Sequence, residues 1–572
     1  MKNSVRKILP FVSRPGRYIG NEINSIHKEN ADVKIALAFP DVYEVGMSYL
    51  GFKILYEIIN SRTDSLAERV YAPWPDMLEE MKKNDIPLFS LESCTSIRDF
   101  DIVGFTLQSE LSYTNILLML EHARINFLSS ERDEREPLLI AGGPCGFNPE
   151  PLADIFDLFV IGDGEEVIHE IIEAYKKNKD KNRHELLKSF AAIQGIYVPS
   201  FYNVYYNTDG TIKEIGTHPI KRNIDGDVSP ISVPDIIKKR IVHDFENIHA
   251  SVKPPVPFIN VIHDRLTLEI MRGCARNCKF CLAGSVYKPV RLRSIDTLIK
   301  QGKSGIKNTG YDEISLSSLN TADYKNIENL VTGFADTFHD DKVSISLPSL
   351  RVDLFSREVA EVIQKLRKPG LTFAPETGTE KLREYINKKI TDEELINITR
   401  IISDLGWNLV KLYFMVGLPT ENFSDVEGIV SLVRKIKDVG SARNKRMNVH
   451  VGVSPFVPKP HTQFQRQKMD SIENLKQKTD FLIKKFGRDV KWHNPKQSCI
   501  EGVFSRGDRR LTKVLITAYK LGCKFDAWNE YFNYDLWQKA FSECNIDPLF
   551  YVSREIKQDE ILPWDLIKCV TN

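Results

Sequence analysis

Three cysteines lie within eight residues of the chain: Cys274, Cys278 and Cys281, in the segment EIMRGCARNCKFCLAG. Thiolates are the usual protein ligands of iron–sulfur clusters, and the spacing C-x3-C-x2-C lets one short loop reach three irons of a cubane. No fourth cysteine lies nearby in the sequence, so one iron would stay open for a small molecule to coordinate. The pattern therefore predicts a 4Fe–4S cluster with one open iron.

Other interpretations of these cysteines stay open on the spacing alone. A zinc site normally has four ligands, often as paired C-x2-C motifs, and no second pair exists, although a distant cysteine or His263 would complete one. An electron-transfer ferredoxin would need a fourth cysteine close in space. Such a zinc or iron–sulfur protein would be a non-catalytic scaffold or sensor. Coincidental clustering is the remaining alternative.

The cysteines follow a predicted strand within residues 258–465, where apolar strands alternate with helical patterns such as 357–368 and 424–440. The expected strands are 266–273, 312–319, 342–350, 370–376, 409–419 and 447–455. Six strand–helix units in about 200 residues predict a partial (β/α)6 barrel whose C-terminal rim carries the chemistry.

The first 180 residues show a shorter version of the same alternation. Strands are expected at 33–40, 101–108, 137–144 and 157–165, with helices at 46–60, 114–125 and 165–177. This order predicts an α/β, doubly wound (Rossmann-like) domain over residues 1–180. Glycines follow two of these strands, at the edge where open α/β sheets bind ligands: Gly142, Gly143, Gly162 and Gly164.

The two remaining parts of the chain are less regular. Residues 181–257 begin with a charged stretch, continue through an irregular hairpin and end in the proline-stiffened connector KPPVP, which predicts a linker segment. Residues 466–572 are rich in helical patterns and aromatic residues, which predicts a C-terminal helical extension.

Composition and charge indicate the class of protein and its cellular compartment. Of the 572 residues, 42% are hydrophobic and 27% charged, as in soluble globular proteins, and the formal net charge of +1 argues neither for nor against nucleic acid. No apolar run reaches the roughly 18–20 residues that span a bilayer, and the N-terminus lacks a signal peptide pattern. We therefore expect a cytoplasmic protein without a membrane segment. The other cysteines are scattered singly and are expected to be buried apolar thiols: Cys94, Cys145, Cys499, Cys523, Cys544 and Cys569.

The cysteine motif, with Phe280 before its last cysteine, resembles the signature of the radical S-adenosylmethionine (SAM) superfamily. The resemblance implies that SAM chelates the open iron and that the reduced cluster cleaves it to a 5′-deoxyadenosyl radical. It also implies an external electron donor such as flavodoxin or ferredoxin. Phe280 is then expected to lie in the cofactor site.

Later segments of the predicted barrel resemble the SAM-binding segments of this superfamily, in the same order. The resemblance implies that Ser317 and Ser318 contact the SAM amino group, although the common Gly-Gly-Glu is missing there. It implies further contacts to the polar ends, the ribose and the adenine of SAM from Ser349, Arg351, Glu376 and Gly417.

A doubly wound domain before such a barrel resembles the cobalamin-binding class of the superfamily. DLFVIGDGEE (157–166) and AGGP (141–144) carry the likeness, which implies that Gly142, Gly143, Gly162 and Gly164 contact a corrinoid. The chain has no Asp-x-His-x-x-Gly motif, so no motif histidine would ligate cobalt. Two alternatives follow: cobalamin bound without a histidine ligand, or a supporting domain that has lost the cofactor.

Two short basic groups allow two interpretations each: neutralising a cofactor or anionic substrate, or pairing with acidic neighbours. The first is Lys288, Arg291 and Arg293, just past the cysteines. The second lies beside Asp508, where salt bridging is favoured over an RNA contact: Arg506, Arg509 and Arg510.

The whole chain resembles an uncharacterised family of cobalamin-domain radical SAM proteins with a shared C-terminal extension, through residues 272–294, 504–511 and 562–567. The leading hypothesis is a radical SAM enzyme, with cobalamin-dependent methyl transfer to an unknown substrate. The alternative within the class is cobalamin-free modification of RNA or protein. The resemblance also implies a radical-SAM-linked partner protein.

Overall fold

A computed structural model describes residues 1–217, 233–348, 357, 360–361, 371–442 and 447–569. Its first sheet has the strand order β2-β1-β3-β4-β5-β6, parallel except for β6. The strands are β1 (Val33–Phe39), β2 (Ser65–Tyr71), β3 (Ile102–Thr106), β4 (Leu138–Gly142), β5 (Leu158–Val160) and β6 (Ile196–Tyr197). This is the doubly wound sheet predicted for the first domain, with its change of direction between β1 and β3.

Strand β2 was not predicted, because its sequence SLAERVY interrupts the apolar run with charged residues, yet every residue in it is buried. Arg69 lies in a buried ion-pair network, where its guanidinium donates to Glu92 at 2.6 Å and to Glu22 at 2.7 Å. Buried charges survive in a protein core when they are paired in this way. The sheet also continues past residue 180, because β6 pairs with β5.

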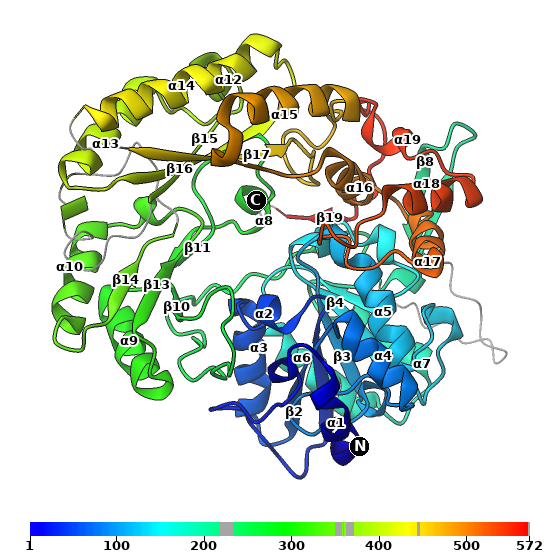
Figure 1. Ribbon diagram of the computed structural model, residues 1–572. Helices are drawn as coiled ribbons and strands as arrows, with labels where there is room; N and C mark the ends of the chain where they lie inside the picture. Colours follow the sequence, from blue (N-terminus) through cyan, green and yellow to red (C-terminus); the bar gives the residue numbers. More distant parts are fainter. Residues whose placement is uncertain (218–232, 349–356, 358–359, 362–370, 443–446, 570–572) are drawn as a thin grey trace.

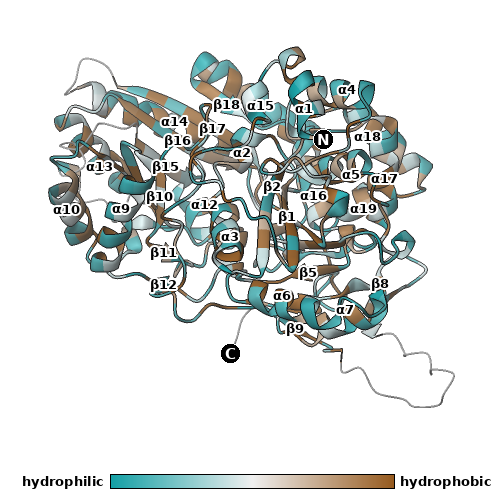
Figure 2. Cartoon of the chain, turned by 90° about the horizontal axis from the view of Figure 1, so that it is seen from below, coloured by the Kyte–Doolittle hydropathy of each residue, from teal (hydrophilic) through white to brown (hydrophobic). Residues whose placement is uncertain are grey.

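Helices cover both faces of this sheet (Figure 1). α3 (Leu50–Ser61) and α6 (Val167–Asn178) contact each other on one face, and α4 (Pro75–Lys83) and α5 (Tyr113–Ala123) lie on the other side. Figure 2 shows β1 and β5 largely brown, while α6 and α7 (Arg183–Ala191) carry much teal. The core thus lies between apolar strands and the inner faces of amphipathic helices. Two short helices complete this part, α1 (Lys2–Ile8) and α2 (Tyr43–Gly46).

Gly162, just after β5, has a conformation and a packing that exclude a side chain. Its φ is +111°, and a Cβ there would lie 2.1 Å from the carbonyl oxygen of Arg240. We expect Gly162→Ala to destabilise the protein by roughly 1–3 kcal/mol or more, through backbone strain and this clash. Urea unfolding measures the loss, and Gly146→Ala is the matched control because a Cβ there meets nothing within 4 Å. Equal unfolding midpoints for the two variants would contradict the expectation.

The second half of the fold contains the predicted strand–helix units as two parallel sheets, β10-β13-β14 and β15-β16-β17-β18. Within the described ranges these sheets do not close into a barrel. The strands are β10 (Leu266–Glu269), β13 (Glu313–Ser317), β14 (Ser344–Ser346), β15 (Leu371–Glu376), β16 (Leu409–Val416), β17 (Asn448–Pro455) and β18 (Val490–Trp492). The first predicted strand is broken after Glu269, and its end forms β11 (Met271–Arg272), paired with β12 (Arg291–Leu292). β18 was not predicted.

Helices separate these strands in the expected way. They are α8 (Leu282–Val286), α9 (Ile295–Thr309), α10 (Ile327–Phe338), α12 (Glu380–Tyr385), α13 (Asp392–Asp404), α14 (Phe423–Ser441) and α15 (Ile472–Phe486). The helix predicted at 357–368 falls largely outside the described residues.

The C-terminal extension is divided between the two halves of the molecule. α15 contacts α14 and β18, whereas α16 (Pro495–Ser505) and α17 (Leu511–Leu521) contact the N-terminal domain at 110–112, at α5 and at 150–152. Apolar residues of the extension and of the first domain form one continuous core. In Figure 1 the orange and red helices accordingly lie beside α5. The last helices are α18 (Tyr534–Glu543) and α19 (Leu549–Val552).

Two arginines of the second basic group form salt bridges, as predicted, whereas Arg506 donates to the backbone carbonyls of Gln467 and Arg554. Arg509 pairs with Glu150 at 3.0 Å, and Arg510 pairs with Asp508 at 2.6 Å. The predicted hairpin is β7 (Tyr202–Tyr206) with β8 (Ile212–Thr217), and β19 (Ile567–Lys568) pairs with β9 (Ile237–Lys238). In the described part of the chain, no helix combines the length and the apolar character needed to cross a membrane.

Candidate active site

The three clustered cysteines differ from all the others in exposure. Cys274, Cys278 and Cys281 are partly exposed free thiols, whereas the other six cysteines are buried, as predicted. They lie on the loop between β11 and α8, and the Cys281 sulfur accepts a hydrogen bond from the Gly284 N–H at 3.3 Å. Three accessible thiols on one loop are a donor set that fits an iron–sulfur cluster.

The segment after β15 holds this loop in place. The Lys279 N–H donates to the Ile386 carbonyl at 3.0 Å, and the Asn387 amide donates to the Asn277 carbonyl at 2.9 Å. Both contacts use backbone atoms of the loop, so they fix its path without involving the cysteine side chains. The loop is therefore tied to this segment at Asn277 and Lys279.

The arrangement does not favour a mononuclear metal site. No group of three or more His, Cys, Asp or Glu side chains could hold a metal ion in the portion of the chain described above. His263, the histidine that would have completed a zinc site, has its ring Nδ1 3.0 Å from the Arg265 guanidinium, and its backbone N–H donates to the Ser48 hydroxyl. Thiolates of a cubane bind separate irons, so they need not converge on one point.

Phe280 packs into an apolar cluster next to the cysteine loop. It lies half-buried against this cluster, which consists of Leu382, Ile386, Leu418, Phe456 and Phe464. The Phe464 N–H donates to the Lys279 carbonyl at 3.1 Å, so the cluster is tied to the loop. The structure thus gives Phe280 an anchoring contact with the barrel.

Glu376 is close to the cysteines and has an unusual backbone. Its φ is +72°, at the point where the β15–β16 register shifts, and its carboxylate accepts a hydrogen bond from Lys388 at 2.5 Å. Burial is the main cause that raises the pKa of the Cys281 thiol, and Cys274 and Glu376 lie near enough to raise it further. A left-handed conformation in a residue other than glycine is a strain typical of functional sites.

Ser317 and Ser318 lie at the end of β13, as expected for a rim segment, and both line the large cavity described below. The Ser318 hydroxyl is 3.0 Å from that of Thr321. Arg276 of the cysteine loop pairs with Asp323 at 2.6 Å, so the loop after β13 is also joined to the cysteine loop.

Gly417 stands at the turn after β16 with a φ of +83°. Its N–H donates to the Glu421 carboxylate at 2.8 Å, and a Cβ at this position would lie 2.6 Å from the Leu475 side chain. The N–H is therefore already engaged, and the turn packs against α15. Ser349 and Arg351 lie outside the described residues.

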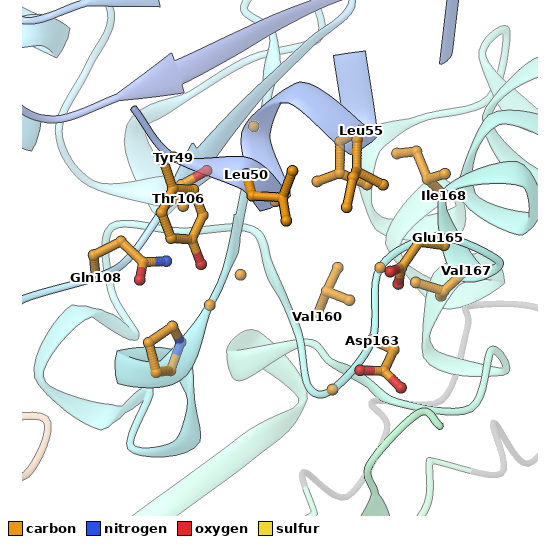
Figure 3. A pocket seen from close by; sticks show the side chains of 18 of the residues that line it. Tyr49, Leu50, Leu55, Thr106, Gln108, Val160, Asp163, Glu165, Val167 and Ile168 are labelled. Atoms are coloured by element: carbon orange, nitrogen blue, oxygen red, sulfur yellow. The ribbon is translucent and has the colours of Figure 1, made fainter. Parts of the chain in front are cut away.

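A cavity of about 430 Å³ lies between the N-terminal sheet and the barrel strands. It has the size of a small-molecule site. It reaches down the sheet face between α3 and α6, where Figure 3 shows Leu50, Leu55 and Val160 around the open space. The predicted corrinoid contacts Gly142, Gly143, Gly162 and Gly164 line it together with Ser317 and Ser318. The fold thus brings two separately predicted sets of residues to one cavity.

Two of these glycines have reasons of their own to be glycine. Gly143 has a φ of +115°, and a Cβ there would lie 2.6 Å from the Leu107 carbonyl oxygen; Gly162 is confined in the same way by Arg240. A Cβ at Gly142 would have only an ordinary contact with Val160. Backbone conformation and packing therefore account for glycine at positions 143 and 162 without a ligand, although both residues line the cavity.

Sequence reasoning missed the polar groups in the cavity wall. The Gln108 side-chain nitrogen is buried and has no hydrogen-bond acceptor within the described residues (Figure 3). Burial raises the pKa of Tyr49 strongly, so its hydroxyl keeps its proton and remains a donor. Gln108 ends a predicted strand and was detectable by that position, whereas nothing in the sequence marks Tyr49. No histidine is among the described residues that line the cavity.

Comparisons with known proteins agree with this architecture. The family described as "Radical SAM proteins, N-terminal" matches residues 51–199, and the "Radical SAM superfamily" matches residues 268–433. The chain is 29% identical to the uncharacterised protein MJ0966 of Methanocaldococcus jannaschii, over 84% of this chain and 90% of that protein. It is 22% identical to an uncharacterised methyltransferase, PH0819, of Pyrococcus horikoshii, over 68% of this chain and 73% of that protein.

Among solved structures, the chain is similar in fold to the radical SAM methyltransferase TsrM of Kitasatospora setae, which was determined with cobalamin and a 4Fe–4S cluster bound. The TM-score is 0.51 at 13% identity, over 78% of this chain and 75% of TsrM. This chain belongs to the radical SAM superfamily, and its first domain matches the N-terminal region of radical SAM proteins. It is therefore an enzyme whose cofactors are a 4Fe–4S cluster and SAM.

Proposed function

We propose that Cys274, Cys278 and Cys281 hold the cluster and leave one iron for SAM. The observation that carries this proposal is the loop itself, whose three thiols are the partly exposed ones among the nine cysteines. When bound and reduced by a donor such as flavodoxin or ferredoxin, the cluster supplies the electron that cleaves SAM to a 5′-deoxyadenosyl radical. The protein orients SAM and excludes water.

The residues around the loop have distinct tasks in this proposal. Glu376, beside Cys281, accepts hydrogen bonds from SAM hydroxyls, and Ser317 and Ser318 face SAM from the end of β13. The apolar cluster around Phe280 closes one side of the site to water. A dry site protects a reactive radical from side reactions.

We further propose that the cavity takes a corrinoid without a histidine ligand and that the enzyme transfers a methyl group to an unidentified substrate. Three features support this fit: an apolar interior along the sheet, donor groups on Gln108 and Tyr49 for the amide groups at a corrin edge, and a lining without histidine among the described residues. A bound corrinoid supplies the methyl group. The cavity also reaches Arg272 and Gly273, next to Cys274, so both cofactors would adjoin the same space.

The experiment that tests the proposed function is anaerobic reconstitution of the full chain with iron, sulfide and hydroxocobalamin. We expect about four irons and four sulfides per chain, a stable corrinoid absorbance after gel filtration, and 5′-deoxyadenosine on reduction with SAM. Production of 5′-deoxyadenosine without corrinoid retention would refute methyl transfer and leave a cobalamin-free radical SAM enzyme.

Gly104 offers a selective test of the cavity. It lies in the middle of β3 at the cavity wall, and a Cβ there would have only an ordinary contact, 3.7 Å from the Leu37 side chain. Isoleucine is favoured in β-strands, and at position 104 its side chain would fill apolar space in the cavity. We therefore expect Gly104→Ile to raise the dissociation constant of hydroxocobalamin by about tenfold or more. Gly216→Ile in β8 is the control, because a Cβ there meets only the end of the Glu214 side chain. Unchanged affinity in Gly104→Ile would place the corrinoid elsewhere.

A further inference from the structure

A compact group of charged side chains joins the cavity to the cysteine loop. We name it the ion-pair hub and define it as Asp163, Glu165, Glu269, Arg272 and Arg291. Asp163 and Glu165 belong to the loop after β5, which Figure 3 shows at the edge of the cavity. Arg272 and Arg291 face each other across the β11–β12 pair. The hub therefore connects a cavity wall of one domain to the strand that leads into the cysteines of the other.

Arg272 is the centre of the hub. Its guanidinium donates to Asp163 at 3.1 Å and to Glu165 at 2.5 Å, and it forms a two-pronged pair with Glu269 at 2.8 Å. The exposed fractions of these side chains are small, 11% for Arg272, 9% for Asp163 and 6% for Glu165. Because the Arg272 guanidinium is planar and its donors point in fixed directions, its orientation depends on the positions of all three carboxylates.

Stabilisation of the fold does not by itself explain why these charged side chains are gathered here. Three carboxylates and two guanidinium groups gather here in a largely buried place, and Arg293 and Lys239 also interact with these carboxylates. A buried ion pair is often no more stabilising than apolar residues of similar volume, since desolvation opposes the attraction. Four hub members, Asp163, Glu165, Glu269 and Arg272, also line the cavity. The three carboxylates therefore face any molecule that binds in the cavity.

The path from Arg272 to the first cysteine is short and stiff. Arg272 lies two residues before Cys274. Gly273, between them, has a φ of +90°, and a Cβ there would lie 2.5 Å from the Pro289 carbonyl oxygen. Arg291 holds the other oxygen of Asp163 at 2.5 Å. A displacement of the 163–165 loop must therefore move Arg272 or break these contacts.

We propose that Arg272 is a positioning residue that couples occupancy of the cavity to the geometry of the cysteine loop, through its ion pairs with Asp163 and Glu165. This inference rests on the proposed corrinoid cavity. A ligand that settles against the 162–165 loop orders the two carboxylates, which fix the Arg272 fork and so the start of the cysteine loop. Binding of one cofactor thereby prepares the site of the other.

The test is anaerobic hydrogen exchange of the cluster-loaded full chain, with and without hydroxocobalamin. In the wild-type protein we expect slower exchange on binding both in residues 158–168 and in residues 274–282, the latter by about fivefold or more, the lower end of typical coupling between sites. In Arg272→Lys we expect the slowing in 158–168 to persist and the slowing in 274–282 to disappear. Lysine keeps the positive charge but lacks the planar guanidinium that binds the three carboxylates.

Two further variants secure the result. Arg265→Lys is the matched control, because Arg265 pairs with Glu313 at 2.9 Å outside the cavity, and it should behave as the wild type does. Glu165→Gln removes one partner without changing shape and should reduce the slowing in 274–282 even if Arg272→Lys does not fold.

The two possible failures are distinguishable. Slowing of both segments in Arg272→Lys and Glu165→Gln, as in the wild type, overturns the coupling and leaves the corrinoid proposal intact. The absence of slowing in the wild-type 158–168 segment, together with no retained corrinoid absorbance, overturns the corrinoid proposal and the coupling with it.

Discussion

Replacement of Cys278 by alanine is expected to abolish production of 5′-deoxyadenosine from SAM. Cys278 is the middle thiol of the loop, and without it two cysteines would have to hold a cluster that already lacks a fourth protein ligand. Reconstituted Cys278→Ala should therefore contain far less than four irons per chain and show no product above the protein-free background. Iron and sulfide analysis, together with chromatographic quantification of 5′-deoxyadenosine, measures both effects.

The control for this variant is Cys544→Ala, which removes a buried thiol in the C-terminal extension. Loss of such a thiol creates a small cavity and costs about 1 kcal/mol, too little to unfold a protein of this size. The control should keep its iron and its product. Normal SAM cleavage by Cys278→Ala would contradict the assignment of the cysteine loop.

Replacement of Glu376 by glutamine is expected to raise the KM for SAM by about tenfold or more while leaving the iron content unchanged. Hydrogen bonds to charged groups contribute about 1.5–3 kcal/mol, and each 1.4 kcal/mol is a factor of ten in affinity. The substitution also removes the charged partner of Lys388. The effect is expected on SAM binding and not on iron content, because Glu376 is near enough to raise the pKa of Cys281 but is not one of the three proposed cluster ligands.

Glu384→Gln is the control for this second variant. Glu384 lies on α12, close in sequence and exposed. Its KM for SAM should equal that of the wild type. An unchanged KM in Glu376→Gln, or a loss of iron in that variant, would show that Glu376 does not serve as a SAM contact.

Local signals in the sequence predicted most of the chemistry and most of the strands. The cysteine spacing is local, and segments 33–40 and 447–455 became β1 and β17. β1 is an apolar run that is buried almost throughout, whereas in β17 buried residues alternate with exposed or half-buried ones. Strand β2 was not predicted because the partners of its charged residues are distant in the sequence: Arg69 pairs with Glu22 and Glu92, and Glu68 accepts hydrogen bonds from Ser90 and Ser93. Strand β18 was not predicted because it is only three residues long.

Long-range packing accounts for the rest of what sequence reasoning missed. The helical character of the C-terminal extension was predicted, but its helices also share a core with the first domain, an arrangement that no local pattern encodes. The four predicted glycines line the cavity, and the backbone carbonyls of Leu107 and Arg240 confine two of them. The ion-pair hub likewise joins Asp163 to Arg272, which are 109 positions apart.

The most direct test of the central claim asks whether SAM binds an open iron of the cluster. The reduced, reconstituted protein should show an electron paramagnetic resonance signal that changes when SAM is added, with further broadening when the SAM carboxylate carries oxygen-17. This result would place the carboxylate on iron, as the three-cysteine loop predicts. A spectrum that SAM leaves unchanged, with no oxygen-17 broadening, would contradict an open iron and with it the proposed SAM-cleaving site.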